Sequence, residues 1–260
     1  AGVLAASMLF TGCSKKAESK VPDKLIVGTN AEFPPFEYMN DKKQPEGFDI
    51  AMIKEIGKRM GKKVEIKNME FKSLIGAMES DSINAIIAGM TKTEKREKAV
   101  DFSDSYYTTN QAIILKKDSK ITKLAQLDGK KIGVQEGTTG DLISSGDKFG
   151  DGKKAKVLVK GAKVKRFKKG VDAVMDLKNG SVDAVVIDEL TANEFVKKNA
   201  KKLKIVIDSA GSEYYCIALT KGNTAYKEEV NKQIKAIKED GTYDLSLIHI
   251  SEPTRLRCIS

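Results

Sequence analysis

The sequence has very few of the residues that metal and nucleophile sites need. Its 260 residues include one histidine, three cysteines and no tryptophan. Cys13, Cys216 and Cys258 lie far apart in the chain, and none of them has the spacing of a zinc-binding pair. A serine–histidine or cysteine–histidine mechanism would depend on His249 alone. The composition therefore predicts neither a metal site nor a cofactor.

A long hydrophobic run is also missing. The small, apolar residues 1–10, AGVLAASMLF, are too few to span a bilayer, but they are typical of the end of a signal peptide. The tetrapeptide FTGC at residues 10–13 is similar to the lipobox of bacterial lipoproteins, in which Cys13 would carry the lipid. The polar residues 14–23 suit a tether. We therefore expect a lipoprotein that is anchored to the outer face of the cell membrane.

Acidic residues are outnumbered by basic ones, 36 to 46, which gives a formal net charge of +10. Most of the basic residues are lysines spread along the chain, which is typical of a solvated surface rather than of a nucleic-acid site. The densest basic patch is KVKRFKK at residues 163–169. We expect a solvated loop there, with an acidic or lipid surface as the alternative. Nucleic acid is excluded as a partner.

The most informative stretch is residues 86–107, IIAGMTKTEKREKAVDFSDSYY. Its first apolar residues are typical of a strand buried on both faces. Gly89 then lets the backbone approach a ligand, and Thr91 begins the Thr-x-x-Glu pattern of a helix whose free N–H groups would favour an anion. Arg96, one turn into this helix, is placed to reach a carboxylate. The same pattern also fits an ordinary strand-to-helix turn with a solvated arginine.

Aromatic and acidic residues elsewhere complete a candidate pocket. Phe33, Phe36 and Phe71 would cover an apolar part of a ligand, and Asp188 would pair with an ammonium group. Each has a structural alternative, because the aromatic residues could belong to the core and Asp188 could cap the helix after it. Together with Arg96, they describe a pocket for a zwitterion, and hence for a free amino acid.

Two segments of the chain resemble each other, which indicates two similarly built lobes. Residues 78–87, MESDSINAII, and residues 177–186, LKNGSVDAVV, each combine a helix end, a turn and a buried strand. The alternation of strands and helices predicts an α/β fold with mostly parallel sheets, whose ligands bind at the carboxyl ends of the strands. A second polar turn of this kind precedes a helix that Thr138 and Asp141 would cap.

From about residue 24 to residue 244 the chain closely resembles the polar amino-acid-binding proteins of ABC importers. This is the bacterial extracellular solute-binding protein family 3, of the Venus-flytrap type. The resemblance implies the type II periplasmic-binding-protein fold, in which two lobes are joined by a two-strand hinge. The motifs that carry it are VGTNAEFPPFE (27–37), GFDI (47–50), the stretch 88–107, GVQEGTT (133–139), DAVVID (183–188) and DGTY (240–243).

The resemblance implies a role for each part of the pocket. Arg96 would hold the α-carboxylate of the ligand, with help from Thr91 and the backbone of residues 138–139. Gly89 and Asp188 would take the α-ammonium group. The residues that we expect to bind the ligand are Asn30, Phe33, Phe36, Phe71, Ala88, Gly89, Thr91, Arg96, Gln135, Thr138, Thr139 and Asp188.

The resemblance also places the ligand side chain between Phe33 and Phe71, with Asn30 at its polar end. Gln135 could line the same end, or could belong to a solvated loop. Asn30 stands where the family often has an aspartate, and a neutral amide suits a cationic side chain less well than a carboxylate does. We therefore expect a polar, uncharged amino acid such as glutamine, with a basic amino acid as the next choice.

The expected organisation is a two-lobed binding protein that the chain crosses twice, near residues 108–111 and 213–215. Closure of the lobes on a free L-amino acid would give the form that an ABC permease recognises, and we expect a monomer. Residues 245–260 depart from the family and look foreign. The expected boundaries are 1–23 for the signal-peptide remnant, lipobox and linker, 24–107 with 214–244 for lobe one, 108–213 for lobe two and 245–260 for the tail.

Three other functions remain open from the sequence. The first is an enzyme on the same fold, such as a cyclohexadienyl dehydratase or a cell-wall lytic enzyme, which would need a carboxyl of raised pKa in the cleft. The second is the input module of a sensor or receptor. The third is an adhesin-like surface lipoprotein that binds through its basic coat.

Overall fold

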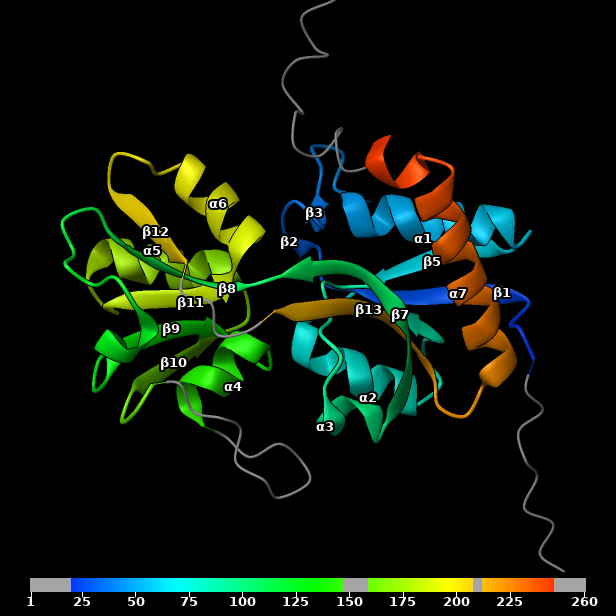
Figure 1. Ribbon diagram of the computed structural model, residues 1–260, viewed down its shortest axis with the longest axis horizontal. Coiled ribbons are helices and arrows are strands. Elements are labelled where there is room, and N and C mark those ends of the chain that lie inside the picture. The colour runs from blue at the N-terminus through cyan, green and yellow to red at the C-terminus, as the bar shows by residue number, and fades with distance from the viewer. Residues whose placement is uncertain (1–19, 147–158, 208–211, 246–260) are drawn as a thin grey trace, which may run out of the picture.

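A computed structural model describes residues 20–146, 159–207 and 212–245 of the chain. These residues form two α/β lobes that lie side by side and are joined by two extended segments (Figure 1). The expected α/β class and two-lobed architecture are confirmed. Cys13, His249, Cys258 and residues 246–260 lie outside the described residues, so the expectations about the lipid anchor and the tail stay expectations.

Lobe one is built on a five-stranded sheet with the order β5-β1-β6-β13-β7. Its first three strands are parallel, whereas β13 runs antiparallel to both β6 and β7. A small antiparallel sheet of β2, β3 and β4 is added beside the cleft. The strands are β1 (Lys24–Thr29), β2 (Glu32–Phe33), β3 (Glu37–Met39), β4 (Pro45–Glu46), β5 (Lys63–Asn68), β6 (Ala85–Ile86), β7 (Val100–Thr109) and β13 (Glu213–Thr220).

Lobe two has a five-stranded sheet of the same mixed kind, with the order β10-β9-β11-β8-β12. Strands β10, β9 and β11 are parallel, and β8 runs antiparallel to β11 and β12. Only one side of each sheet is therefore parallel, where the sequence had predicted mostly parallel sheets. The strands are β8 (Gln111–Lys116), β9 (Lys131–Gln135), β10 (Lys163–Phe167), β11 (Ala184–Asp188) and β12 (Leu203–Ile207).

Helices cover both faces of each sheet (Figure 1). Helices α1 and α7 lie on one face of lobe one and α2 on the other, while α5 and α6 oppose α4 in lobe two. The α-helices are α1 (Phe48–Arg59), α2 (Leu74–Glu79), α3 (Glu94–Glu97), α4 (Thr139–Ser145), α5 (Gly170–Asn179), α6 (Glu189–Lys197) and α7 (Thr224–Glu239); two 3₁₀ turns are η1 (Phe71–Ser73) and η2 (Leu124–Leu127). No helix within the described ranges combines the length and the apolar character needed to cross a membrane.

Burial on both faces explains the apolar runs that the sequence shows. In β11, Val185 and Ile187 join one core cluster, whereas Ala184 and Val186 join the cluster on the opposite face. Successive side chains of a strand point to opposite faces, so a strand covered on both sides needs a continuous apolar run. The run that ends at Ala88 has the same arrangement, although only Ala85–Ile86 forms a regular strand.

The chain passes between the lobes in two extended segments. Strand β7 continues through Asn110 into β8, and β13 carries the chain back into lobe one. One expectation was wrong: the basic segment 163–169, taken as a loop, contains β10, which lies at the edge of its sheet and, among the strands that the structure describes, pairs with β9 alone. Lysines are common on such edge strands because their charge discourages pairing with other chains.

Candidate functional site

A small, partly open cavity lies between the two lobes. It is bounded from lobe one by the loop after β1, the start of η1 and the segment after β6, and from lobe two by the ends of β9 and β11 and the start of α4. The lining residues are Asn30, Phe33, Phe71, Ala88, Gly89, Thr91, Arg96, Gln135, Thr138, Thr139 and Asp188. The structure therefore brings together all but one of the residues that the sequence analysis selected.

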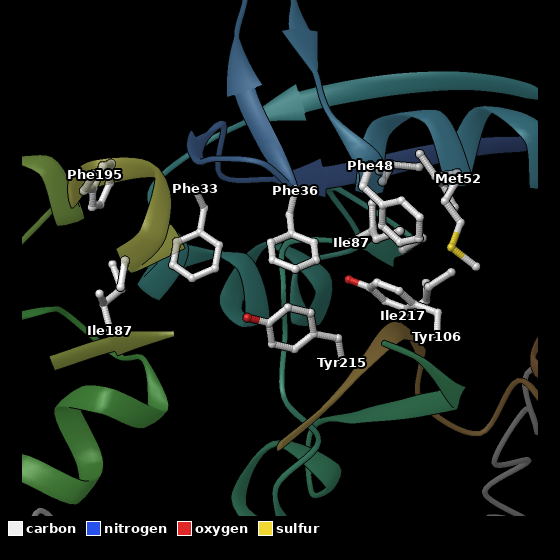
Figure 2. Close-up of a cluster of buried hydrophobic side chains, with 14 of the residues drawn as sticks. Phe33, Phe36, Phe48, Met52, Ile87, Tyr106, Ile187, Phe195, Tyr215 and Ile217 are labelled. Carbon is white, nitrogen blue, oxygen red and sulfur yellow. The ribbon is translucent and has the colours of Figure 1, made fainter. Parts of the chain in front are cut away.

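Phe36 is the exception, because its ring lies in the core rather than on the cavity wall. It is 1% exposed and packs edge-on against Tyr215 and Tyr107, each at a centroid distance of 5.0 Å. Figure 2 shows its ring between those of Phe33 and Phe48, above Tyr215. Phe36 thus packs behind Phe33, which does line the cavity. Phe36 belongs to the core, which was the alternative to ligand binding for this aromatic residue.

Arg96 is a buried cation that faces the cavity. Its guanidinium group donates hydrogen bonds to the carbonyl oxygens of Thr91, at 2.5 Å, and Gly137, at 3.1 Å, and lies 5.2 Å from the centre of the Phe71 ring. Burial lowers its pKa to about 10, while the negative charges of Glu213 and Asp188 act in the opposite direction. The group therefore remains charged at neutral pH and suits a carboxylate.

The helix that carries Arg96 differs from the expected one. Helix α3 is a single turn, and its N-cap is Thr93, whose hydroxyl accepts a hydrogen bond from the Arg96 N–H at 3.3 Å. Thr91 lies outside the helix and forms an isolated bridge with Tyr215 of β13. The expected anion site at the N-terminus of this helix is therefore not supported, because so short a helix has only a small dipole.

Gly89 is held by the buried carboxyl group of Asp49, which does not line the cavity. Its N–H donates to Oδ2 of Asp49 at 2.8 Å, and the hydroxyl of Tyr106 donates to the same oxygen at 2.8 Å. Burial raises the pKa of Asp49 to about 6, and burial together with the neighbouring Asp49 raises the pKa of Glu37 well above its usual value. This arrangement fixes the orientation of the Gly89 peptide beside the cavity.

Asp188 is the acidic group of the cavity wall. It occupies the N-cap position of α6 but makes no capping hydrogen bond; instead the Tyr215 hydroxyl and the Gln111 amide donate to its two oxygens. Burial, followed by the charge of Glu213, raises its pKa to about 8. The carboxyl thus points at the cavity, where an ammonium group would stabilise its ionised form.

The two amides at the other end of the cavity bridge the lobes. Nε2 of Gln135 in lobe two donates to Oδ1 of Asn30 in lobe one at 2.8 Å. Nδ2 of Asn30 is bonded to the Met69 carbonyl at 2.8 Å. Oε1 of Gln135 is buried and has no hydrogen-bond partner in the structure, and the residue is 2% exposed. A buried acceptor without a donor is unfavourable, so this oxygen is suited to an N–H group of a ligand.

Ion pairs join the lobes around the rim of the cavity. Each pair has a partly exposed lysine and a glutamate from opposite lobes, and the three N–O distances lie between 2.6 and 2.9 Å. Two of the lysines belong to the basic segment 163–169, so part of that patch faces an acidic wall of this same chain. The pairs are Lys72–Glu136, Lys168–Glu70 and Lys169–Glu32.

Sequence reasoning missed Glu213, Gln111 and Tyr215, which all contact residues of the site. Oε2 of Glu213 accepts hydrogen bonds from the hydroxyls of Thr91 and Thr139, each at 2.7 Å. These residues lie at the two crossings between the lobes, and that position is the signal that could have pointed to them. Within the described ranges, no cluster of three or more histidine, cysteine, aspartate or glutamate residues could hold a metal ion.

Comparisons with known proteins agree with this geometry. The chain is 34% identical over 233 residues to the arginine-binding extracellular protein ArtP of Bacillus subtilis (strain 168). The aligned region covers 88% of this chain and 87% of that protein. Its structure is similar to that of an ancestral arginine-binding protein bound to arginine, with a TM-score of 0.80, 42% identity and coverage of 89% of this chain and 99% of the other.

A structure of an ancestral arginine-binding protein bound to glutamine is similar to the same degree, with a TM-score of 0.79, 41% identity and coverage of 89% and 99% of the two chains. These relatives are solute-binding proteins rather than enzymes, which removes the dehydratase and lytic-enzyme alternatives. The sequence model of the bacterial extracellular solute-binding proteins, family 3, matches residues 25–247. The chain belongs to this family of extracytoplasmic amino-acid-binding proteins of ABC transporters.

Proposed function

We propose that the chain captures a free, polar L-amino acid in the cavity between its lobes and delivers it to the permease of an ABC importer. The buried Gln135 Oε1, which has no hydrogen-bond partner, is the observation that carries the choice of ligand. An amino acid whose side chain ends in N–H groups would satisfy this acceptor. Glutamine and arginine both have such side chains, and relatives bound to or named for each of them are known.

The main-chain groups of the ligand have complementary partners in the cavity. Arg96 would bind the α-carboxylate, because its planar guanidinium suits a carboxylate and it is charged at neutral pH. Asp188 and the fixed Gly89 peptide would bind the α-ammonium group. Burying a zwitterion is unfavourable unless both charges are paired, so a ligand that lacks either group should bind weakly.

Closure of the two lobes would complete the site. Asn30, Thr91 and Arg96 belong to lobe one, whereas Gln135 and Asp188 belong to lobe two, so only the closed arrangement presents all of these groups to one ligand. Such closure is favoured by a ligand that binds the closed state better than the open one. We further propose that a monomer works in this way outside the cytoplasm, tethered through a lipid on Cys13.

The neutral amides Asn30 and Gln135 favour glutamine, because a buried guanidinium group would require a carboxylate. The rim acids Glu32, Glu70 and Glu136 are each engaged by a lysine. Arginine is the ligand named for the relatives described above, and it would have to draw one of these acids away from its lysine. A direct screen separates the two choices.

The experiment is a thermal-shift screen of the purified full chain against the twenty L-amino acids. A ligand that binds only the folded state stabilises it by about 2.7 kcal/mol at a hundredfold excess over the dissociation constant. We expect the largest shift with L-glutamine or L-arginine, and we expect Arg96→Ala to abolish it. Arg59→Ala is the matched control, because Arg59 pairs with Glu55 and Asp240 away from the cavity. A folded chain that responds to no amino acid would refute the proposal.

A further inference from the structure

Glu213 holds a carboxylate between the lobes, in contact with Thr91, which is expected to help Arg96 bind the α-carboxylate of the ligand. The residue begins β13, at the second crossing of the chain. Its Oε2 atom accepts hydrogen bonds from Thr91 Oγ1 of lobe one and from Thr139 Oγ1 of lobe two, each at 2.7 Å. A single carboxylate oxygen therefore joins the two lobes, next to the buried cation Arg96.

The number of protons on the two threonines limits what they can bind. A hydroxyl group has one O–H donor, and a carboxylate only accepts. Each threonine therefore uses its one proton on Glu213, and neither can donate to a second carboxylate at the same time. A ligand whose α-carboxylate is to be held by these two hydroxyls has to displace the carboxylate of Glu213.

From this we infer that Glu213 is an internal competitor of the ligand: its carboxylate takes the threonine donors that the α-carboxylate of an amino acid would use, so the two carboxylates exclude each other at these hydroxyls. This inference rests on the proposed function, because it assumes that the ligand carries an α-carboxylate. Glu213 does not line the cavity, yet by this inference it sets the affinity for the ligand and restricts the site to ligands that are able to displace a carboxylate.

The charges around Glu213 also favour this competition. The charge of Glu213 supports the protonated form of Arg96 and adds to the rise in the pKa of Asp188. A ligand α-carboxylate at the same place would add a second negative charge beside Glu213, and like charges at close range repel. Glu213 is only partly buried, at the edge of lobe one, so its side chain can rotate toward solvent when it is displaced.

The test compares ligands that have and lack an α-carboxylate. Titration calorimetry would measure L-arginine, L-glutamine and their α-amides against the wild-type chain and Glu213→Gln. Hydrogen bonds to a neutral amide are roughly half as strong as those to a carboxylate, so the two threonines should be released more readily. We expect Glu213→Gln to bind the amino acid that the wild type binds about tenfold more tightly, and the α-amide with no comparable gain.

Two further variants make the test specific. Glu189→Gln removes the same charge near the first crossing, where Glu189 accepts from Asn110 at 3.3 Å, and should leave the affinity nearly unchanged. Adding Thr139→Val to Glu213→Gln removes one of the contested donors, so most of the gain in affinity should disappear.

Separate outcomes distinguish a failure of this inference from a failure of the proposed function. Unchanged or weaker binding of the amino acid by Glu213→Gln would overturn the competition. An equal gain for the α-amide would overturn it as well, while wild-type binding that requires Arg96 would leave the proposed function standing. A wild-type chain that binds none of the twenty L-amino acids would overturn the proposed function and the competition together.

Discussion

Asp188 should make the stability of the ligand-free protein decrease as the pH rises. Its folded-state pKa is raised from 3.8 to about 8, so between these values the folded protein keeps a proton that the unfolded chain releases. Unfolding then releases a proton, and the free energy of unfolding falls with increasing pH. Below pH 3.8 both states hold the proton and above about pH 8 neither does, so this dependence is confined to the interval between them.

The slope follows from the linkage relation. One proton released on unfolding corresponds to about 1.4 kcal/mol for each pH unit, so Asp188 contributes a loss of about 3 kcal/mol between pH 5 and pH 7. Asp49 and Glu37, whose pKa values are also raised by burial, add to the slope of the wild type. The contribution of Asp49 cancels when the wild type is compared with Asp188→Asn, and that of Glu37 cancels for the most part, because the charge of Asp188 is the smallest cause of the raised pKa of Glu37.

Urea denaturation followed by circular dichroism at about pH 5, 6, 7, 8, 9 and 10 measures this difference. We expect the wild type to lose stability relative to Asp188→Asn at about 1.4 kcal/mol per pH unit, and the two curves to become parallel above about pH 8. The control Asp172→Asn changes an exposed carboxylate of α5 and should follow the wild type. If the wild type and Asp188→Asn lose stability in parallel from pH 5 to 7, the reasoning about the buried carboxyl is refuted.

Three other predictions concern the cavity and its rim. Gly89→Ala places a Cβ at a position where φ is +51° and the nearest ring atom of Phe33 is 3.2 Å away. Urea denaturation should show a free energy of unfolding that is lower by about 1–3 kcal/mol, and amino-acid binding should be weaker. A fully stable variant would contradict this. Gln135→Leu removes the unpaired acceptor and should weaken binding of the ligand at least tenfold by calorimetry, with a smaller effect on L-alanine. Lys168→Met removes the exposed ion pair with Glu70, so the affinity for the ligand should change by less than about fivefold. Raising the salt concentration from about 0.1 M to about 1 M should have a similarly small effect on the affinity. A hundredfold loss of affinity would show that the ion pairs at the rim decide closure.

Local patterns predicted the parts of the site that depend on neighbouring residues. Thr138 caps α4 as its position before a helical segment indicated, with its hydroxyl accepting from the Asp141 N–H at 3.3 Å. The apolar run before Gly89 and the run that precedes Asp188 both proved to be buried on two faces. Such patterns are visible in sequence because the period of the side chains and the capping residue lie within a few positions of each other.

Contacts between distant segments could not be predicted in the same way. The Thr-x-x-Glu pattern predicted that Thr91 begins the helix, but Thr93 caps it, and the hydroxyl of Thr91 donates instead to Glu213, 122 residues away. Phe36 was placed with the ligand as one of three aromatic residues that could cover it, yet its ring packs against Tyr107 and Tyr215. Both outcomes depend on tertiary packing, which overrides local preference.

The position of β13 has a consequence for the order in which the lobes fold during synthesis. This strand, residues 213–220, lies between β6 and β7 in the sheet of lobe one, whereas the sheet of lobe two uses only residues 111–207. The centre of lobe one is thus incomplete until residue 220 has left the ribosome, although most of that lobe is made first. Lobe two can close its sheet earlier from one continuous segment, and we expect it to be the first folded unit of the nascent protein.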